Sequence, residues 1–548
     1  MNFGFVFGQK LILKVSAKDS TNTVLINTIH YQKVHFSKIS LDASLDSIHE
    51  KLERKGFLNV SLDTLIKKDT VYFATFNLKN RNKTIRIYYA KKDVAKKTIY
   101  KIVPHAKVED GYFEVPLENL SEILDAFVTV FEAQGNSFTQ VSLQKIQVEK
   151  RLINAQLMIK KSRVRKIDKV VINGYKEFPK TFLRNFLHLQ PTTLFSRKKL
   201  NESSKLIAFL PFVTEMKPPE VLFTKDSTIL YLYLKKKISN KFDGLVGFTS
   251  KENGNGILFN GYLDLALHNI FDGGESFSIY WKNNGNDRQV FDLNLKVPYI
   301  FNARFSPSVE LNIYKQDSSF ISTKTKLNVP YIVNERLSLG ISLQSENSTN
   351  LLTSNGDNIN DFKTSFYGIN YAYQIFNNNV LFPTKFSVFG EFLSGKKKNT
   401  GNTTNQTKLY LKTIYLWYVS PRSHLYLQNE TSTLLSDNIL VNELFRIGGV
   451  NSIRGFNEES IFASTYSYFN IEYRYNTNTS SYLYSITDVG YIDNETIQQS
   501  SQIYSLGLGY AFTTKLGVLN LSYAIGNFSS RPFDINNSRF HVKIVSFF

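Results

Sequence analysis

The second half of the chain alternates apolar and polar residues with a period of two, and this pattern constrains the fold more than any other feature. The alternation is clear at residues 291–297, 309–313, 337–343 and 469–475. Successive side chains of a β-strand point to opposite faces, so each segment would have one apolar and one polar face. We count about sixteen such segments of about ten residues, which is enough to cross a membrane when tilted. They start near 242, 256, 274, 288, 303, 320, 334, 362, 383, 406, 422, 465, 482, 501, 516 and 538.

The pattern predicts a transmembrane β-barrel of about sixteen antiparallel strands at residues 238–548. The 31 Tyr and 44 Phe suit the aromatic belts of such barrels. The sequence has no apolar run of 18 residues or more, so we expect no transmembrane helix. A soluble β-sandwich would also alternate, but it would bury the apolar faces against a second sheet and rarely has so many long strands.

A glycine-rich stretch separates the eleventh and twelfth predicted strands. Glycine tolerates backbone angles that other residues avoid, so we expect a tight loop that presents Arg454; the alternative is an ordinary surface loop. On the twelfth strand, Glu472 and Arg474 would face inward. A guanidinium in a confined lumen needs a carboxylate and can pair with it through two hydrogen bonds. The loop residues are Gly448, Gly449, Ile453, Arg454, Gly455 and Phe456.

The stretch resembles the signature of the outer-membrane assembly-factor superfamily, the barrels that include BamA, TamA and the two-partner secretion translocators. The resemblance implies that the Arg454 tip folds back into the lumen. It also implies that Asp488, in a motif with Gly490, contacts this arginine. The turn at 269–275 resembles a further superfamily motif, with its glycines displaced by one position. The final segment, 540–548, ends in phenylalanine and resembles the terminal signal of outer-membrane barrels.

Residues 11–237 read as one small α/β unit repeated, and in the first copy the apolar residues at 41, 45, 48 and 52 form a helical stripe. The last copy is the clearest, with the order strand, helix, helix, strand, strand. This order resembles the polypeptide-transport-associated (POTRA) domain that precedes barrels of the superfamily. We predict three such domains, at 10–93, 94–162 and 163–237, and we assign the strand at 84–90 to the first. Residues 1–9 read as the remnant of a signal peptide.

The charge is concentrated in the first 237 residues, which carry 41 Lys and Arg against 22 Asp and Glu. A basic soluble part can bind nucleic acid, anionic lipid or acidic polypeptide, or can reflect a generally basic proteome. No nucleic-acid motif accompanies the charge, so we expect no nucleic-acid partner. Exposed sheet edges of small α/β domains can bind extended chains by strand addition, and the alternative role of the domains is that of spacers or docking arms.

Several kinds of chemistry lack their sequence motifs. The chain has no cysteine, no Gly-x-Ser-x-Gly nucleophile motif, no phosphate-binding loop and no His-Glu-x-x-His zinc motif. We therefore expect no enzymatic activity, no cofactor and no metal site. Arg454 and Asp488 are then structural or gating residues rather than catalytic ones.

The resemblance implies handling of polypeptides in the outer membrane of a Gram-negative bacterium, with the soluble domains in the periplasm. Our first hypothesis is an insertion factor. In this hypothesis the first strand, weakened by Gly244 and Gly247, pairs poorly with the last strand, which ends at Phe548. The open seam between them is then a template for client strands.

The alternative is a two-partner secretion translocator. Three soluble domains and no evident plug helix favour insertion, and a passive porin or anchor is the third class. The expected partners are unfolded outer-membrane or secreted polypeptides, the lipid bilayer, and periplasmic or lipoprotein accessory subunits.

Overall fold

The computed structural model describes most of the chain and divides it into two compact units. The first contains Met1–Ile167, Thr192–Lys199 and Lys225–Thr228, and the second contains Asp168–Pro191, Leu200–Thr224 and Ile229–Phe548. The described residues are all except 1–9, 20–25, 80, 82, 150–151, 238, 251–256, 285–287, 353–357, 378, 380, 400, 515–516, 533 and 546–548. The predicted signal-peptide remnant and Phe548 lie outside the described residues.

The first α/β domain is a four-stranded sheet covered by one long helix. The sheet has the order β2-β1-β4-β3, and helix α2 (Lys38–Arg54) buries the predicted apolar stripe Leu41, Leu45, Ile48 and Leu52. The Ser37 hydroxyl caps this helix by accepting a hydrogen bond from the Ser40 N–H at 3.2 Å. The strands are β1 (Leu11–Ala17), β2 (Val34–His35), β3 (Ser61–Lys68) and β4 (Val71–Asn77).

The second α/β domain is a five-stranded sheet with the order β6-β7-β5-β9-β8. Its central strand, β5 (Thr84–Tyr88), is the strand we assigned to the first domain, so that assignment and the 93/94 boundary are wrong. Burial explains the difference, because Ile85 and Ile87 lie in one core with Phe113 and Phe127. The other elements are α3 (Lys96–Ile102), β6 (Lys107–Val108), β7 (Tyr112–Pro116), η1 (Leu117–Asn119), α4 (Leu120–Ala133), β8 (Gln140–Glu149) and β9 (Leu152–Lys160).

The third α/β domain is a three-stranded sheet with two helices. Its order is β10-β12-β11, and the central strand buries Leu230, Leu232 and Leu234. The elements follow the predicted order strand, helix, helix, strand, strand. They are β10 (Lys169–Asn173), α5 (Lys180–Asn185), α6 (Arg197–Ile207), β11 (Val213–Phe223) and β12 (Thr228–Lys236).

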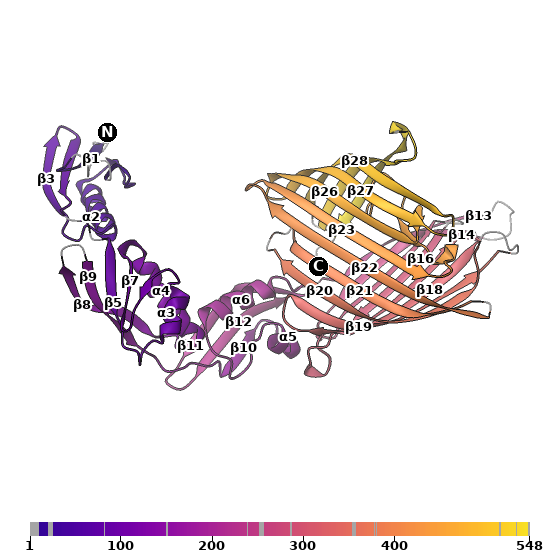
Figure 1. Cartoon of the computed structure of the whole chain (residues 1–548), viewed down its shortest axis with the longest axis horizontal. Helices are drawn as coiled ribbons and strands as arrows, with labels where there is room; N and C mark the ends of the chain where they lie inside the picture. Colours follow the sequence, from indigo (N-terminus) through magenta and orange to yellow (C-terminus); the bar gives the residue numbers. More distant parts are fainter. Residues whose placement is uncertain are drawn as a thin grey trace, which may run out of the picture. The chain divides into compact units, whose positions relative to one another are not determined.

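The C-terminal part is a sixteen-stranded antiparallel β-barrel, in which each strand pairs with the next (Figure 1). Its strands begin within six residues of the predicted starts. They are β13 (Lys241–Ser250), β14 (Ile257–His268), β15 (Ser276–Asn284), β16 (Arg288–Lys296), β17 (Ser308–Gln316), β18 (Phe320–Ile332), β19 (Leu337–Asn350), β20 (Phe362–Phe376), β21 (Thr384–Asn399), β22 (Asn402–Tyr418), β23 (Ser423–Ser436), β26 (Thr465–Asn478), β27 (Ser481–Asn494), β28 (Gln499–Thr514), β29 (Gly517–Phe528) and β30 (Ser538–Val545). Short 3₁₀ turns lie at η2 (Ile300–Asn302) and η4 (Ile535–Asn537).

Strands β13 and β30 are the two edges of the sheet, and the described residues show no pairing between them. The strands near these edges are also the shortest. Strands β13–β17 have 9 to 12 residues, β29 has 12 and β30 has 8. We call these strands the short wall. Strands β18–β28, which have 13 to 17 residues in the sheet, form the long wall.

Alternation along each strand separates two faces of the barrel. On β19, Leu339 and Ile341 are exposed on the outer face, whereas Ser342 and Glu346 are buried on the inner face. We call the end of the barrel with the β14–β15 turn the near end, because β13 begins there, and the opposite end the far end. Among the described helices, none has the length and apolarity needed to cross a bilayer.

Candidate functional site

The segment 437–464, which connects β23 to β26 at the far end, folds back into the lumen. It contains η3 (Val441–Glu443) and a small hairpin of β24 (Phe445–Ile447) with β25 (Ile461–Ala463). We call this segment the lumen loop. It packs an apolar cluster against inward side chains of the barrel wall, and Ile453 is fully buried there. The cluster comprises Ile447, Ile453, Phe456, Ile461 and Ala463 of the loop with Tyr466, Tyr468, Ile492 and Ile503 of the wall.

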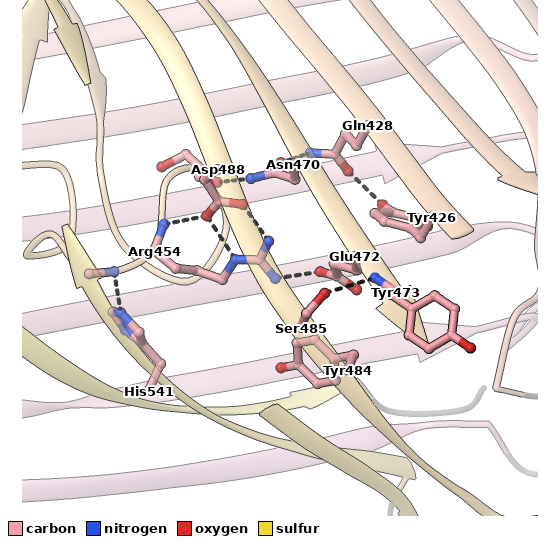
Figure 2. Close-up of polar contacts among 12 residues, drawn as sticks. Tyr426, Gln428, Arg454, Asn470, Glu472, Tyr473, Tyr484, Ser485, Asp488 and His541 are labelled. Atoms are coloured by element: carbon pink, nitrogen blue, oxygen red, sulfur yellow. Dashed lines mark hydrogen bonds and ion pairs between the residues drawn. The ribbon is translucent and has the colours of Figure 1, made fainter. Parts of the chain in front are cut away.

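Arg454, at the tip of the lumen loop, is held by two carboxylates of neighbouring strands (Figure 2). Its Nε donates to Asp488 Oδ2 at 2.9 Å, and its Nη2 donates to the other oxygen of the same carboxylate. The Arg454 backbone N–H also donates to Asp488 Oδ2 at 3.0 Å, and Nη1 pairs with Glu472. Asp488 lies on β27 and is 0% exposed. The arrangement fixes both the position and the orientation of the guanidinium plane.

Two glycines allow the tip to approach the wall closely. Gly455 has φ +82°, and a Cβ there would lie 2.3 Å from the backbone nitrogen of Gly526 on β29. A Cβ on Gly490 would lie 3.2 Å from the side chain of Ile453. Any other residue at Gly455 would therefore push the loop tip away from the wall. Gly448 and Gly449 also have positive φ, at +111° and +94°.

Arg474 belongs to the same network but does not contact Arg454. Its Nε donates to Glu472 Oε2 at 2.7 Å, so Glu472 lies between the two arginines. The Arg474 guanidinium also lies 3.8 Å from the ring centroid of Tyr426. Two cations and two carboxylates then balance in charge, which is the condition for burying them together.

The lumen loop also contacts strands on the short wall. Arg288 on β16 pairs with Glu459 at 2.8 Å and donates to the Glu458 carbonyl at 3.0 Å. On the last strand, His541 Nε2 accepts a hydrogen bond from the Gly455 N–H at 3.1 Å (Figure 2). Arg539 of the same strand donates to Asn457 at 2.8 Å. The loop tip thus reaches from β27 to the edge strand β30.

A buried ion pair fixes the base of the lumen loop to the long wall. Lys397 on β21 pairs with Glu443 of η3 at 2.7 Å, and their side chains are 1% and 3% exposed. Gln406 donates to the other oxygen of Glu443 at 2.6 Å. The Leu440 N–H donates to Glu443 as well, at 2.8 Å. Each polar atom of this pair is thereby matched, as a buried charge requires.

At the near end, the β14–β15 turn is joined to the third α/β domain. The Tyr175 hydroxyl donates to Asp272 at 2.6 Å, and Lys236 pairs with Asp272 at 2.8 Å. The hydrogen bonds from Lys236 and Tyr175 lower the pKa of Asp272. Partial burial, together with the bond to Asp272, raises the pKa of Tyr175. Asn269 donates to the Tyr175 hydroxyl at 2.6 Å and completes this cluster.

The structure brings together most residues of the predicted site. Arg454 contacts both Asp488 and Glu472 directly. Arg474 is connected to this group through Glu472. Gly490 has no side chain and so leaves room for Ile453 to pack against the wall. Gly244 and Gly247 lie elsewhere, on the edge strand β13.

Sequence reasoning missed His541, Arg288 and the pair Lys397–Glu443. His541, Arg288 and Lys397 have only an inward position in an alternating strand as a signal, which many residues share, and Glu443 lies in the turn η3, which no strand pattern marks.

The comparisons with known proteins agree with this fold. Residues 286–512 match the family described as haemolysin secretion/activation protein ShlB/FhaC/HecB. CdiB from Acinetobacter baumannii is similar at 14% identity and a TM-score of 0.51, over 90% of this chain and 96% of that one. CdiB from Escherichia coli is similar at 11% identity and a TM-score of 0.51, over 91% and 95% of the two chains.

A structure of BamA from Haemophilus ducreyi lacking POTRA domains 1-3 matches at 12% identity and a TM-score of 0.48, over 83% of this chain and 97% of that one. No curated protein matches the chain in sequence. Residues 286–512 are therefore similar to the ShlB/FhaC/HecB family, and the fold of the chain is similar to that of the CdiB structures.

Proposed function

We propose that this protein is a polypeptide translocator of the outer membrane, which exports a partner chain through its lumen. The α/β domains would lie in the periplasm and receive the partner unfolded, and the lumen loop would act as the gate. The family match over the barrel supports this proposal, because that family is described by secretion and activation of a haemolysin. Our first hypothesis from the sequence, an insertion factor, becomes the second candidate.

One observation carries the proposal: the lumen loop lies inside the barrel, anchored at its base and held at its tip by ion pairs to the wall and by the apolar cluster around Ile453. The base is anchored by the buried Lys397–Glu443 pair, whereas the tip is held through Arg454. Ion pairs can exchange partners along a polar wall, and the inner wall of the barrel carries further charged side chains that could serve as partners. Lys326–Glu391, at 2.8 Å, and Lys412–Glu430, at 2.8 Å, are two such inward pairs. A tip that exchanges partners can move aside for a passing chain without releasing its base.

The direct test is removal of the protein from its host. We expect deletion to remove one or a few proteins from the culture medium and to leave the other outer-membrane barrels at normal levels, as measured by quantitative proteomics of both fractions. Complementation with the wild type should restore export, and Arg454→Ala should not. Arg422→Ala is the matched control, because Arg422 is an exposed arginine in the β22–β23 turn. Broad loss of outer-membrane barrels would instead favour insertion.

The second candidate, insertion of client barrels, is favoured by the two sheet edges. Strands β13 and β30 each have one neighbour in the described residues, and an unpaired edge presents backbone groups to an incoming strand. Gly244 and Gly247 weaken β13 further.

A panel of disulfides between β13 and β30 separates the candidates. A locked seam should abolish insertion but leave export through the lumen intact. Loss of export in every locked variant, with recovery on reduction, would contradict the lumen route.

A further inference from the structure

A cavity of about 420 Å³ lies at the near end of the barrel, and we call it the mouth cavity. Its volume is in the range of pockets that bind ligands. Aromatic and apolar side chains of the third α/β domain form one side, namely Phe182, Phe186, Leu210 and Phe212. Tyr299 and Phe376 of the barrel form the other. The cavity therefore combines two parts of the chain that are far apart in sequence.

The mouth cavity opens to the lumen rather than to lipid. Ser338 and Gln374 line it from strands β19 and β20. Ser338 shares its face with Ser342, which is buried and donates to Glu391 inside the barrel at 2.6 Å. The neighbouring residue Leu339 is exposed on the opposite, outer face. A lipid tail would have to pass through the barrel wall to reach the cavity.

Contacts on two sides of the mouth hold the aromatic rings in place. Phe182 lies on Gly274, where a Cβ would be only 2.0 Å from the ring, and its ring centroid is 5.0 Å from that of Tyr299. On the other side, Phe209 stacks on Phe376 at 4.8 Å. The Asn185 amide also donates to the Asn302 carbonyl at 3.3 Å. The apolar surface is therefore built into the fold and is open to the lumen.

We propose that the mouth cavity binds an aromatic side chain of an extended client polypeptide as the client enters the lumen. This inference rests on the proposed function. An unfolded chain exposes aromatic side chains that a folded protein buries. Their transfer from the polar lumen into the apolar mouth cavity is favourable because it removes apolar surface from water. The hydroxyl of Ser338 and the amide of Gln374 can form hydrogen bonds with the backbone N–H and C=O groups of an extended segment, which need such partners. The site recognises unfolded chains by side-chain class rather than by sequence.

The test uses the full-length protein in phospholipid nanodiscs and two short, unstructured, fluorescent peptides. The peptides are identical except that one carries two phenylalanines where the other carries alanines. We expect fluorescence anisotropy to show at least about tenfold tighter binding of the phenylalanine peptide.

Phe186→Ala should remove this preference. Ala372→Trp, which fills the cavity from the barrel wall, should remove it too and decides the question if Phe186→Ala does not fold. Phe271→Ser is the control, because Phe271 is 85% exposed in the β14–β15 turn and does not line the cavity.

Equal affinity of the wild type for both peptides would overturn the inference, as would an unchanged preference in folded Ala372→Trp. Export in cells separates this inference from the proposed function. If the wild type exports its partner and Ala372→Trp exports it equally well, the mouth cavity is not used and the translocator proposal still stands. If deletion of the protein leaves the culture medium unchanged, the translocator proposal fails, and the mouth cavity loses its assigned client with it.

Discussion

The long wall and the short wall of the barrel have the same alternating pattern, but they differ in height and in how deeply their charges are buried. A strand of 16 residues on the long wall extends about 54 Å, and one of 9 residues on the short wall about 31 Å. The pair Lys408–Glu346 inside the long wall has side chains 11% and 7% exposed, whereas Lys241–Asp264 on the short wall is 24% and 31% exposed. Removal of one partner from a buried ion pair destabilises a protein far more than removal of one partner from an exposed pair. The long wall is thus the fixed support of the loop, and the short wall is the part that can rearrange.

The largest expected effect is at the loop tip against the long wall. Arg454→Ala leaves Asp488 buried without its cation, and we expect a loss of about 3–5 kcal/mol in the free energy of unfolding, measured by urea titration in lipid vesicles. Ion conductance in planar bilayers should rise because the tip is released. The stability and the conductance of Arg454→Lys should lie between those of the wild type and those of Arg454→Ala, since lysine keeps the charge but lacks the planar guanidinium. Wild-type stability and conductance of Arg454→Ala would show that the tip is not held as described.

The next effect is at the loop base. Lys397→Met leaves Glu443 buried and unpaired, and we expect a loss of about 3 kcal/mol by the same titration. The double variant Lys397→Met with Glu443→Leu should recover most of this loss, because apolar groups of similar size replace the pair. Lys398→Met is the matched control, since Lys398 is exposed on the same strand. Equal stability of the Lys397 and Lys398 variants would mean that the long wall does not anchor the loop.

A smaller effect is expected where the loop meets the short wall. His541→Leu removes the acceptor of the Gly455 N–H, and an unsatisfied buried donor costs about 1–2 kcal/mol. His541→Gln keeps an acceptor and should behave more like the wild type. The leucine variant should increase conductance less than Arg454→Ala does. An effect of His541→Leu larger than that of Arg454→Ala would reverse the assignment of the fixed and the rearranging wall.

The smallest effect is at the near end of the short wall. Asp272→Asn weakens the contacts with Lys236 and Tyr175, and we expect a loss below about 1 kcal/mol, since the Asp272 side chain is 29% exposed. Because folding lowers the pKa of Asp272, its contribution is complete above the pKa of the unfolded chain, about 3.9, and disappears as the pH falls through the folded pKa. Unfolding at pH 7 should therefore separate the variant from the wild type, and unfolding near pH 3 should bring them closer. A difference that grows on acidification would contradict this account.

The sequence predicted the number of barrel strands and the position of the loop, because alternation reports which face is apolar. It also predicted the helical stripe of the first domain, in which Leu41 and Ile48 are buried. It failed at β5, since Ile85 and Ile87 read equally well as part of either neighbouring core. Strand pairing over long separations decides that choice, and a local pattern does not contain it.

The candidate site was predictable where a motif marked it and not elsewhere. Arg454 and Asp488 stand in short glycine motifs that resemble those of the superfamily, and this resemblance implied their contact. The contact of His541 with Gly455 joins residues 86 positions apart, and nothing near His541 distinguishes it from other inward residues. The mouth cavity depends on how Phe182 of one domain meets Tyr299 of another, which no local pattern encodes.

The contacts of the lumen loop also imply an order of folding. Those of Arg454 to Glu472 and Asp488 close chain segments of 18 and 34 residues, whereas Arg288 to Glu459 closes one of 171 residues. Shorter closures lose less chain entropy and form sooner. We therefore expect the loop tip to dock on β26 and β27 early, as a local folding nucleus, before the N-terminal strands of the barrel are placed. The arginine that holds the lumen loop in the finished barrel would then first serve as a template for the assembly of the barrel.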